Sequence, residues 1–179
     1  NYEVDAEAQE DFLKTHQDID IYIAGEGEEP FAKLLNSLFE YDFDIEKIKK
    51  ERINVGSCHY IIDNEFIRGE LLSPISDLDN IPSPYLSGLL DKPLGQNFIP
   101  MIQTTRGCPF ACTFCQEGDD YYNKIRRFSL DRMKDELSYL AKKETVPSLT
   151  ITDSNFGMYK EDLVFAKEVA SIRDKYNWP

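Results

Sequence analysis

The carboxyl-terminal part of the chain alternates between strand-like and helix-like hydrophobic patterns. The short apolar runs 98–105 and 148–152 are typical of buried strands. Elsewhere apolar residues recur every three or four positions, which predicts a helix from the N-cap Ser129 to Lys143 and another over about 160–176. The two apolar stripes are Leu130, Met133, Leu137 and Leu140, and Phe165, Val169, Ile172 and Tyr176. We expect both stripes to pack in a core.

The amino-terminal part has a different pattern. It predicts a helix over 5–15, a strand over 18–24, a turn at 25–28 and a helix to about Leu38. Pro30 suits the first turn of that helix. We expect this part to belong to an α/β domain.

A connector and a hairpin follow. Residues 40–50 form a charged connector or a short helix, and residues 52–69 predict a hairpin that turns at Asp63 and Asn64. The stretch 73–93 holds four of the nine prolines and is interpreted as an interdomain linker, with one helical turn near 86–90.

Two loops follow the predicted strands of the carboxyl-terminal part. The first spans 106–127 and the second spans 153–159. Strands that alternate with helices build parallel sheets, and ligands of such folds gather at the carboxyl ends of the strands. We therefore expect both loops at the same edge of one sheet.

Composition and charge exclude some classes of protein. Of the 179 residues 41% are hydrophobic, and no run approaches the roughly 18 to 20 apolar residues that span a bilayer. The net charge of −13 repels phosphate backbones and makes nucleic acid an unfavoured partner. Residues 1–10 are polar and acidic and lack the pattern of a signal peptide, so we expect a cytoplasmic protein.

Three of the four cysteines lie within eight residues, at Cys108, Cys112 and Cys115. A tight cysteine cluster in a cytosolic protein binds a metal or takes part in redox chemistry more often than it forms disulfides. Thiolates are the usual ligands of iron–sulfur clusters, and three of them leave one iron of a cubane cluster open. A zinc site with Cys58 as the fourth ligand and an electron-transfer ferredoxin are the alternatives. Without such a role, Cys58 is an ordinary buried residue.

The spacing Cys108-x-x-x-Cys112-x-Phe-Cys115 resembles the motif of the radical S-adenosylmethionine (SAM) superfamily, as do the flanking Thr104–Phe110 and Arg126–Ser129 stretches. This resemblance implies a [4Fe–4S] cluster held by the three cysteines. It also implies SAM bound to the open iron, and reductive cleavage of SAM to a 5′-deoxyadenosyl radical. The resemblance covers 98–179.

The resemblance also implies several SAM-binding residues. The backbone near Phe114 is expected to contact adenine, and Asp153 and Asn155 to accept the SAM amino group, where other family members use a Gly-Gly-Glu-like stretch. A turn with an Asx cap on the next helix is the alternative. Arg126 is a candidate partner for an anionic group, with a surface charge as the alternative. No catalytic residue is assigned.

The turn Gly25-Glu26-Gly27-Glu28 after a strand resembles the end of the cobalamin-binding domain that precedes many radical SAM barrels. A plain strand-to-helix turn is the alternative. The resemblance implies an α/β fold, in which a partial radical SAM (β/α) barrel begins after the tail of a Rossmann-like cobalamin-binding domain. The expected segments are 1–50 for this tail, 51–95 for the hairpin and linker, and 96–179 for the first two βα units.

The sequence thus favours a fragment of a radical SAM enzyme that is associated with cobalamin and catalyses methyl transfer or rearrangement. A radical SAM enzyme without cobalamin and a zinc-stabilised binding module remain alternatives. The expected partners are a small-molecule or biosynthetic-intermediate substrate and an electron donor such as flavodoxin or ferredoxin.

Overall fold

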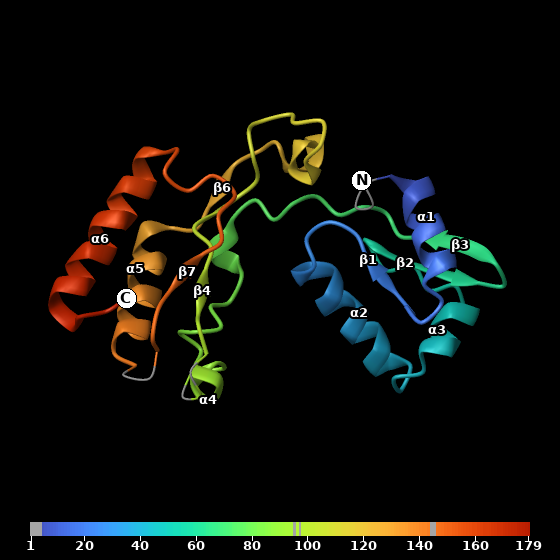
Figure 1. Ribbon diagram of the computed structural model, residues 1–179. Helices are drawn as coiled ribbons and strands as arrows, with labels where there is room; N and C mark the ends of the chain where they lie inside the picture. The colour runs from blue at the N-terminus through green and yellow to red at the C-terminus, as the bar shows by residue number, and fades with distance from the viewer. Residues whose placement is uncertain (1–4, 95, 97, 144–145) are drawn as a thin grey trace. The chain divides into compact units, whose positions relative to one another are not determined.

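The computed structural model describes residues 5–94, 96, 98–143 and 146–179 and divides the chain into two compact units. The first unit extends to Ile75, and the second begins at Ser76 (Figure 1). The division falls within the 51–95 segment. The predicted segments 1–50, 51–95 and 96–179 include positions 1–4, 95, 97 and 144–145, which lie outside the described residues.

Three helices of the first unit begin where the sequence supplies polar caps or acidic first turns. Helix α1 (Ala6–Thr15) follows Asp5, whose side chain accepts hydrogen bonds from the backbone of Glu7 and Ala8. Helix α2 (Glu28–Glu40) begins with two glutamates, which favour the positive end of the helix dipole. Helix α3 (Ile45–Lys50) is capped by Asp44, so the predicted connector contains a short helix.

The three strands of the first unit form an antiparallel sheet in the order β1-β2-β3. These strands are β1 (Tyr22–Ile23), β2 (Cys58–Ile62) and β3 (Glu65–Arg68). Asp63 and Asn64 have φ values of 50° and 61°, as a tight hairpin turn requires, which confirms the predicted turn. The strand before it is shorter than expected, because residues 53–57 are not part of it. Leu34, Val55 and Cys58 form the core beside this sheet.

The second unit contains a parallel strand pair joined by a helical crossover. Strand β4 (Met101–Ile102) pairs in parallel with β7 (Thr150–Ile151), and Ile102 lies opposite Ile151. A second pair, β5 (Thr105–Arg106) and β6 (Arg126–Arg127), is antiparallel. The single strand predicted over 98–105 is therefore two short strands. The parallel pairing agrees with the βα pattern of the sequence.

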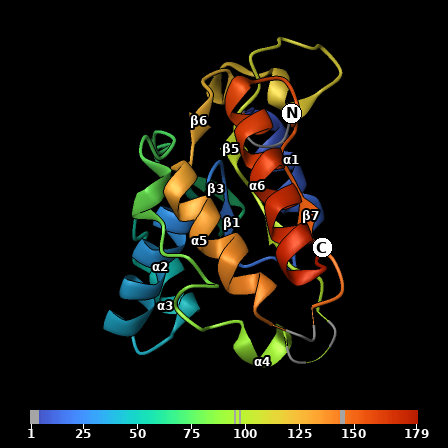
Figure 2. The same ribbon diagram turned by 90° about the vertical axis from the view of Figure 1, so that its left-hand side faces the viewer.

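Helices α5 (Leu130–Ala141) and α6 (Lys160–Tyr176) pack side by side and cover β4 and β7 (Figure 2). Ser129 caps α5 by accepting a hydrogen bond from the backbone of Arg132, as predicted. Both apolar stripes lie in or against the core, which confirms their assignment. The buried residues of this core are Tyr85, Leu94, Ile102, Met133, Leu137, Leu140, Val146, Phe165, Ile172 and Trp178.

Part of the proline-rich stretch packs into the second unit. The Tyr85 hydroxyl donates a hydrogen bond to the Met101 carbonyl oxygen at 2.6 Å, and Tyr85 and Leu94 belong to the core. The predicted helical turn near 86–90 lies slightly later, as α4 (Asp91–Leu94), and a 3-10 helix η1 (Leu78–Asn80) precedes it. Burial of Tyr85 and Leu94 holds this stretch against the unit. The described part of the chain has no helix that is both long and apolar enough to cross a bilayer.

Candidate functional site

The cysteine loop, residues 107–125, is closed at its base by the pairing of β5 with β6. Thr105 lies opposite Arg127 and Arg106 opposite Arg126. The Cys108 N–H donates to the Tyr122 carbonyl oxygen at 2.9 Å, just inside this base. Gly107 has φ 94°, and a Cβ there would lie 2.6 Å from the Lys124 carbonyl oxygen. The tight crossing therefore requires glycine.

The three cysteines of the loop have free thiols, with Cys108 half-buried and Cys112 and Cys115 exposed. The Cys115 N–H donates to the Cys112 carbonyl oxygen at 3.1 Å, so the loop turns between them. Gly118 packs on the peptide of Cys112, where an added Cβ would lie 2.2 Å from the carbonyl oxygen. Two further 3-10 helices, η2 (Gln116–Gly118) and η3 (Asp120–Tyr122), complete the loop.

The cysteine side chains do not converge in the described structure, where no three His, Cys, Asp or Glu side chains are arranged to hold a metal ion. Their donor chemistry nevertheless fits an iron–sulfur cluster, because three accessible thiols outside any disulfide are available within one loop. The assignment of Cys108, Cys112 and Cys115 as ligands stays a prediction from their spacing.

Cys58 differs from these three cysteines. It lies on β2 of the first unit, is buried, and has a thiol whose pKa burial raises to about 11. A buried thiol with this pKa stays protonated at neutral pH and packs as a small apolar side chain. The interpretation of Cys58 as an ordinary buried residue is confirmed.

The second loop, residues 153–159, contacts both Thr104, which lies between β4 and β5, and the cysteine loop. The Thr104 N–H donates to Asp153 Oδ1 at 2.6 Å, and the Thr104 hydroxyl donates to Asp153 Oδ2. The Ser154 hydroxyl donates to Glu117 Oε1, also at 2.6 Å. The two predicted loops therefore lie at the same edge of the sheet, as the βα pattern predicted.

Asp153 does not cap the following helix, so that alternative is wrong. The N-cap of α6 is Tyr159, and Asp162, in the first turn of the helix, accepts hydrogen bonds through Oδ2 from the backbone of Gly157 and Tyr159, both at 3.0 Å. Both oxygens of Asp153 already accept hydrogen bonds from Thr104. Asn155 differs, because its Nδ2 is buried and has no hydrogen-bond partner among the described residues. Because Nδ2 is a donor, only the Oδ1 of Asn155 can accept from the SAM amino group.

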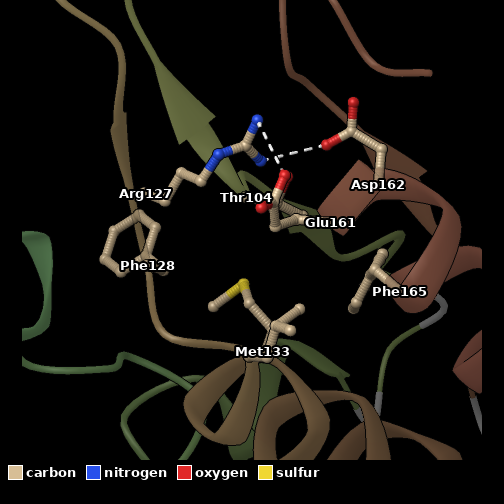
Figure 3. A pocket seen from close by; sticks show the side chains of 8 residues that line it. Thr104, Arg127, Phe128, Met133, Glu161, Asp162 and Phe165 are labelled. Atoms are coloured by element: carbon tan, nitrogen blue, oxygen red, sulfur yellow. Dashed lines mark hydrogen bonds and ion pairs between the residues drawn. The ribbon is translucent and has the colours of Figure 1, made fainter. Parts of the chain in front are cut away.

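The two arginines of β6 have different environments. Arg126 is only 6% exposed, so the alternative of a surface charge is wrong. Arg127 lies on the opposite side of the strand, because side chains alternate along it. Its guanidinium donates from Nη1 to Asp162 Oδ1 at 3.1 Å, and its Nη2 lies 3.9 Å from Glu161 Oε2 (Figure 3).

A small cavity lies beside Arg127, lined by Thr104, Arg127, Phe128, Leu130, Met133, Glu161, Asp162 and Phe165 (Figure 3). Its volume of about 30 Å³ is suited to ordered water, and it is too small for a nucleoside cofactor. Thr104 and Arg127 lie in stretches that resemble the superfamily, but sequence reasoning assigned them no role. For Asp162 the available signal was the acidic first turn of α6.

Two further predicted binding sites are the adenine contact near Phe114 and the cobalamin contact at the Gly25–Glu28 turn. Phe114 is 92% exposed beside Cys115 and is open to a ligand. In the first unit, Gly25 has φ 76° and Gly27 is the N-cap of α2. Glu26 Oε2 accepts a hydrogen bond from the Ile75 backbone at 2.8 Å, and Glu28 begins α2. The predicted cofactor roles of these residues stay predictions.

The sequence profile of the radical SAM superfamily matches residues 102–177, a stretch that contains both loops. These residues are thus a match to the radical SAM superfamily. The matched segment runs from the last residue of β4 through the cysteine loop, α5 and β7 to the end of α6.

Two relatives extend the similarity over nearly the whole chain. The cobalamin-dependent radical SAM methyltransferase TokK of Streptomyces tokunonensis is 30% identical over 174 residues, which cover 94% of this chain and 24% of TokK. The 2-(S-pantetheinyl)-carbapenam-3-carboxylate methyltransferase of Streptantibioticus cattleyicolor is 28% identical over 169 residues, 91% of this chain and 24% of that enzyme. The chain thus spans about a quarter of the length of these relatives.

The fold is also similar to a solved structure. The cobalamin-dependent radical SAM enzyme OxsB, with aqua-cobalamin and SAM bound, superposes with a TM-score of 0.54 at 21% identity. The superposition covers 93% of this chain and 22% of OxsB. An α/β fold similar to that of a radical SAM enzyme is therefore shown.

Proposed function

We propose that this chain is part of a radical SAM enzyme in which Cys108, Cys112 and Cys115 hold a [4Fe–4S] cluster. The observation that supports this most is the loop of three accessible, free thiols within a segment that matches the superfamily. When bound, the cluster supplies the electron that cleaves SAM to a 5′-deoxyadenosyl radical. The residues of the chain hold the cofactors and bring the two loops together.

Several residues fit roles in SAM binding. Phe114 projects into solvent beside the last cysteine, which suits a backbone or ring contact with adenine. The Asn155 amide can accept through its oxygen and donate through Nδ2, which lacks a partner in the described structure. Asp153, held on Thr104, is proposed as a further acceptor for the SAM amino group, and the buried Arg126 as the partner of an anionic group near the cluster.

The chain is further proposed to belong to the cobalamin-associated branch of the superfamily, in which it acts on a small molecule by methyl transfer. The methyltransferase names of the two relatives and their similarity across the Gly25–Glu28 turn support this assignment. In this proposal, residues 1–50 are the tail of a Rossmann-like cobalamin-binding domain and 96–179 begin a partial barrel. Residues 51–95 connect them. A flavodoxin or ferredoxin would supply the electron, and the cytoplasm is the proposed location.

Anaerobic reconstitution of the full-length protein tests the cluster and its reaction. We expect about four irons and four sulfides per chain, as a [4Fe–4S] cluster requires, and 5′-deoxyadenosine after reduction with SAM. One zinc per chain without iron or sulfide would instead establish the zinc-stabilised module. A cluster that never cleaves SAM would contradict the proposed activity.

Titration with a corrinoid tests the cobalamin assignment separately. Tight binding by the full-length protein is the expected result. A protein that cleaves SAM but does not bind the corrinoid would be a radical SAM enzyme without cobalamin, with the first unit in another role.

A further inference from the structure

Asp162 joins three segments of the second unit through one carboxylate. Its side chain is 2% exposed. Oδ2 accepts the backbone N–H groups of Gly157 and Tyr159, and Oδ1 accepts from Arg127 at 3.1 Å. A buried carboxylate with three donors is well satisfied, and it restrains the groups that bind it.

Arg127 brings the end of the cysteine loop into this arrangement. It lies on β6, the strand that closes that loop. Its guanidinium carbon lies 4.3 Å from the centroid of the Tyr159 ring, so the cation packs on a residue of the second loop. Figure 3 shows the guanidinium pointing toward Asp162 and Glu161 from across the cavity.

The second loop is thereby held at both ends. Near its start, Asp153 is bound by the Thr104 backbone and hydroxyl. Near its end, Gly157 and Tyr159 are bound by Asp162, which is bound in turn by Arg127. Asn155, whose Nδ2 lacks a partner in the described structure, lies between these two attachments.

We propose that Arg127 and Asp162 are positioning residues that hold the 153–159 loop against the cysteine loop, so that Asn155 is aligned for SAM. This proposal rests on the proposed function, because it assigns the loop to SAM. Neither side chain needs to touch the cofactor. Residues that orient metal-binding side chains without touching the metal typically contribute roughly 10–100-fold to metal affinity or activity, and we expect an effect of this kind on SAM affinity.

Two variants separate this role from general stability. Arg127→Gln removes the positive charge and the guanidinium N–H donors. Asp162→Asn keeps one side-chain oxygen that can accept from the backbone of the loop, but it weakens the hydrogen bond to Arg127. Lys134→Gln is the matched control, because Lys134 on α5 likewise pairs with a carboxylate of α6, Glu168 at 3.9 Å, but lies outside both loops. Arg127→Lys tests whether charge alone suffices.

The first measurement is amide hydrogen exchange in the cluster-free, full-length protein. We expect faster exchange over 153–159 in Arg127→Gln and Asp162→Asn, and unchanged exchange in Lys134→Gln. Unchanged exchange in both loop variants would overturn the proposal. If one loop variant fails to fold, hydrogen exchange in the other variant tests the proposal. If both fail to fold, Arg127 and Asp162 are required for folding, and the positioning proposal is overturned.

The second measurement uses the reconstituted protein. We expect iron content to be retained, SAM affinity to fall by roughly tenfold or more, and the SAM-dependent change in the electron paramagnetic resonance spectrum of the reduced cluster to weaken. Arg127→Lys should restore part of the affinity. Unchanged SAM affinity, or loss of iron together with affinity, would overturn the proposal. A wild-type cluster that shows no response to SAM would instead contradict the proposed function, and hydrogen exchange would then decide whether the pair holds the loop.

Discussion

The four cysteines differ in exposure, and this difference leads to a prediction about single substitutions. Replacing Cys108, Cys112 or Cys115 by alanine should abolish cluster assembly, because each removes one of three thiolate ligands. Cys58→Ala should retain the cluster, since Cys58 is buried in the first unit and its thiol has a pKa of about 11. Iron and sulfide per folded chain are the measurement. Full iron content in any of the first three variants would contradict their role.

The backbone of Gly118 packs closely on the peptide of a predicted ligand, Cys112. A Cβ at this position would lie 2.2 Å from the Cys112 carbonyl oxygen, so Gly118→Ala must displace the Cys112 peptide. We expect iron content after reconstitution to fall well below the wild-type value. Thr113→Ala, at an exposed position in the same loop, is the control. Equal iron content in both variants would show that the loop tolerates the displacement.

His59 predicts a pH dependence of stability in the first unit. Burial lowers its pKa from 6.5, the nearby Arg68 lowers it further, and the backbone at Cys58 partly opposes them. The Gly69 N–H donates to the Cys58 carbonyl oxygen at 2.9 Å and also to His59 Nδ1 at 3.1 Å, and the second bond requires an unprotonated Nδ1. The stabilisation is therefore complete above about pH 6.5 and is lost as the pH falls through the lowered folded-state pKa.

Hydrogen exchange at the Gly69 amide measures this effect. Exchange, corrected for its intrinsic pH dependence, should reveal easier opening as the pH falls from 7 toward 5. His59→Asn, which offers an uncharged acceptor, should reduce this dependence, whereas the exposed His16→Asn should preserve it. Identical profiles for wild type and His59→Asn would assign the effect to other groups.

At the scale of elements, the helices were predicted more accurately than the strands. Helix α6 has the predicted bounds, and α5 begins after the predicted cap Ser129. Helix signals are local, since caps and apolar spacing lie within one segment. Strand lengths depend on pairing with distant segments, and the predicted run 98–105 contains two strands with different partners, β7 and β6.

The interface between α5 and α6 gives a prediction of stability. Leu137 is fully buried there, whereas Leu163 on α6 is 60% exposed. Leu137→Ala should lower the free energy of unfolding by about 2–5 kcal/mol, because it leaves a cavity in the core. Leu163→Ala is the matched control and should change it by less than about 0.5 kcal/mol. Denaturant titration measures both, and equal effects would contradict the assigned packing.

At the scale of the whole molecule, the division at Ile75 and Ser76 predicts two separate unfolding events. In the full-length protein, Leu137→Ala should lower the protection of amides over 130–141 and leave amides over 58–68 unchanged. Hydrogen exchange with residue resolution is the measurement. A uniform loss of protection in both stretches would show that the two units unfold as one.

The sequence by itself determined the chemistry that the chain can support. The cysteine spacing, the apolar stripes and the order of strands and helices are properties of neighbouring residues, and they led to the radical SAM superfamily that the profile match confirmed. The metal and SAM assignments of individual residues stay predictions.

Only the tertiary structure decided which side chains support the two loops. Asp153 and Thr104 are hydrogen-bonded although they lie 49 positions apart in the sequence. Arg127 and Asp162 are hydrogen-bonded at a separation of 35 positions. No periodicity or motif links such residues, because their contact depends on the parallel pairing of β4 with β7 and on how α6 packs. The tertiary structure also buries Arg126, exposes Phe114 and places the Asp162 carboxylate against the N-cap backbone of α6.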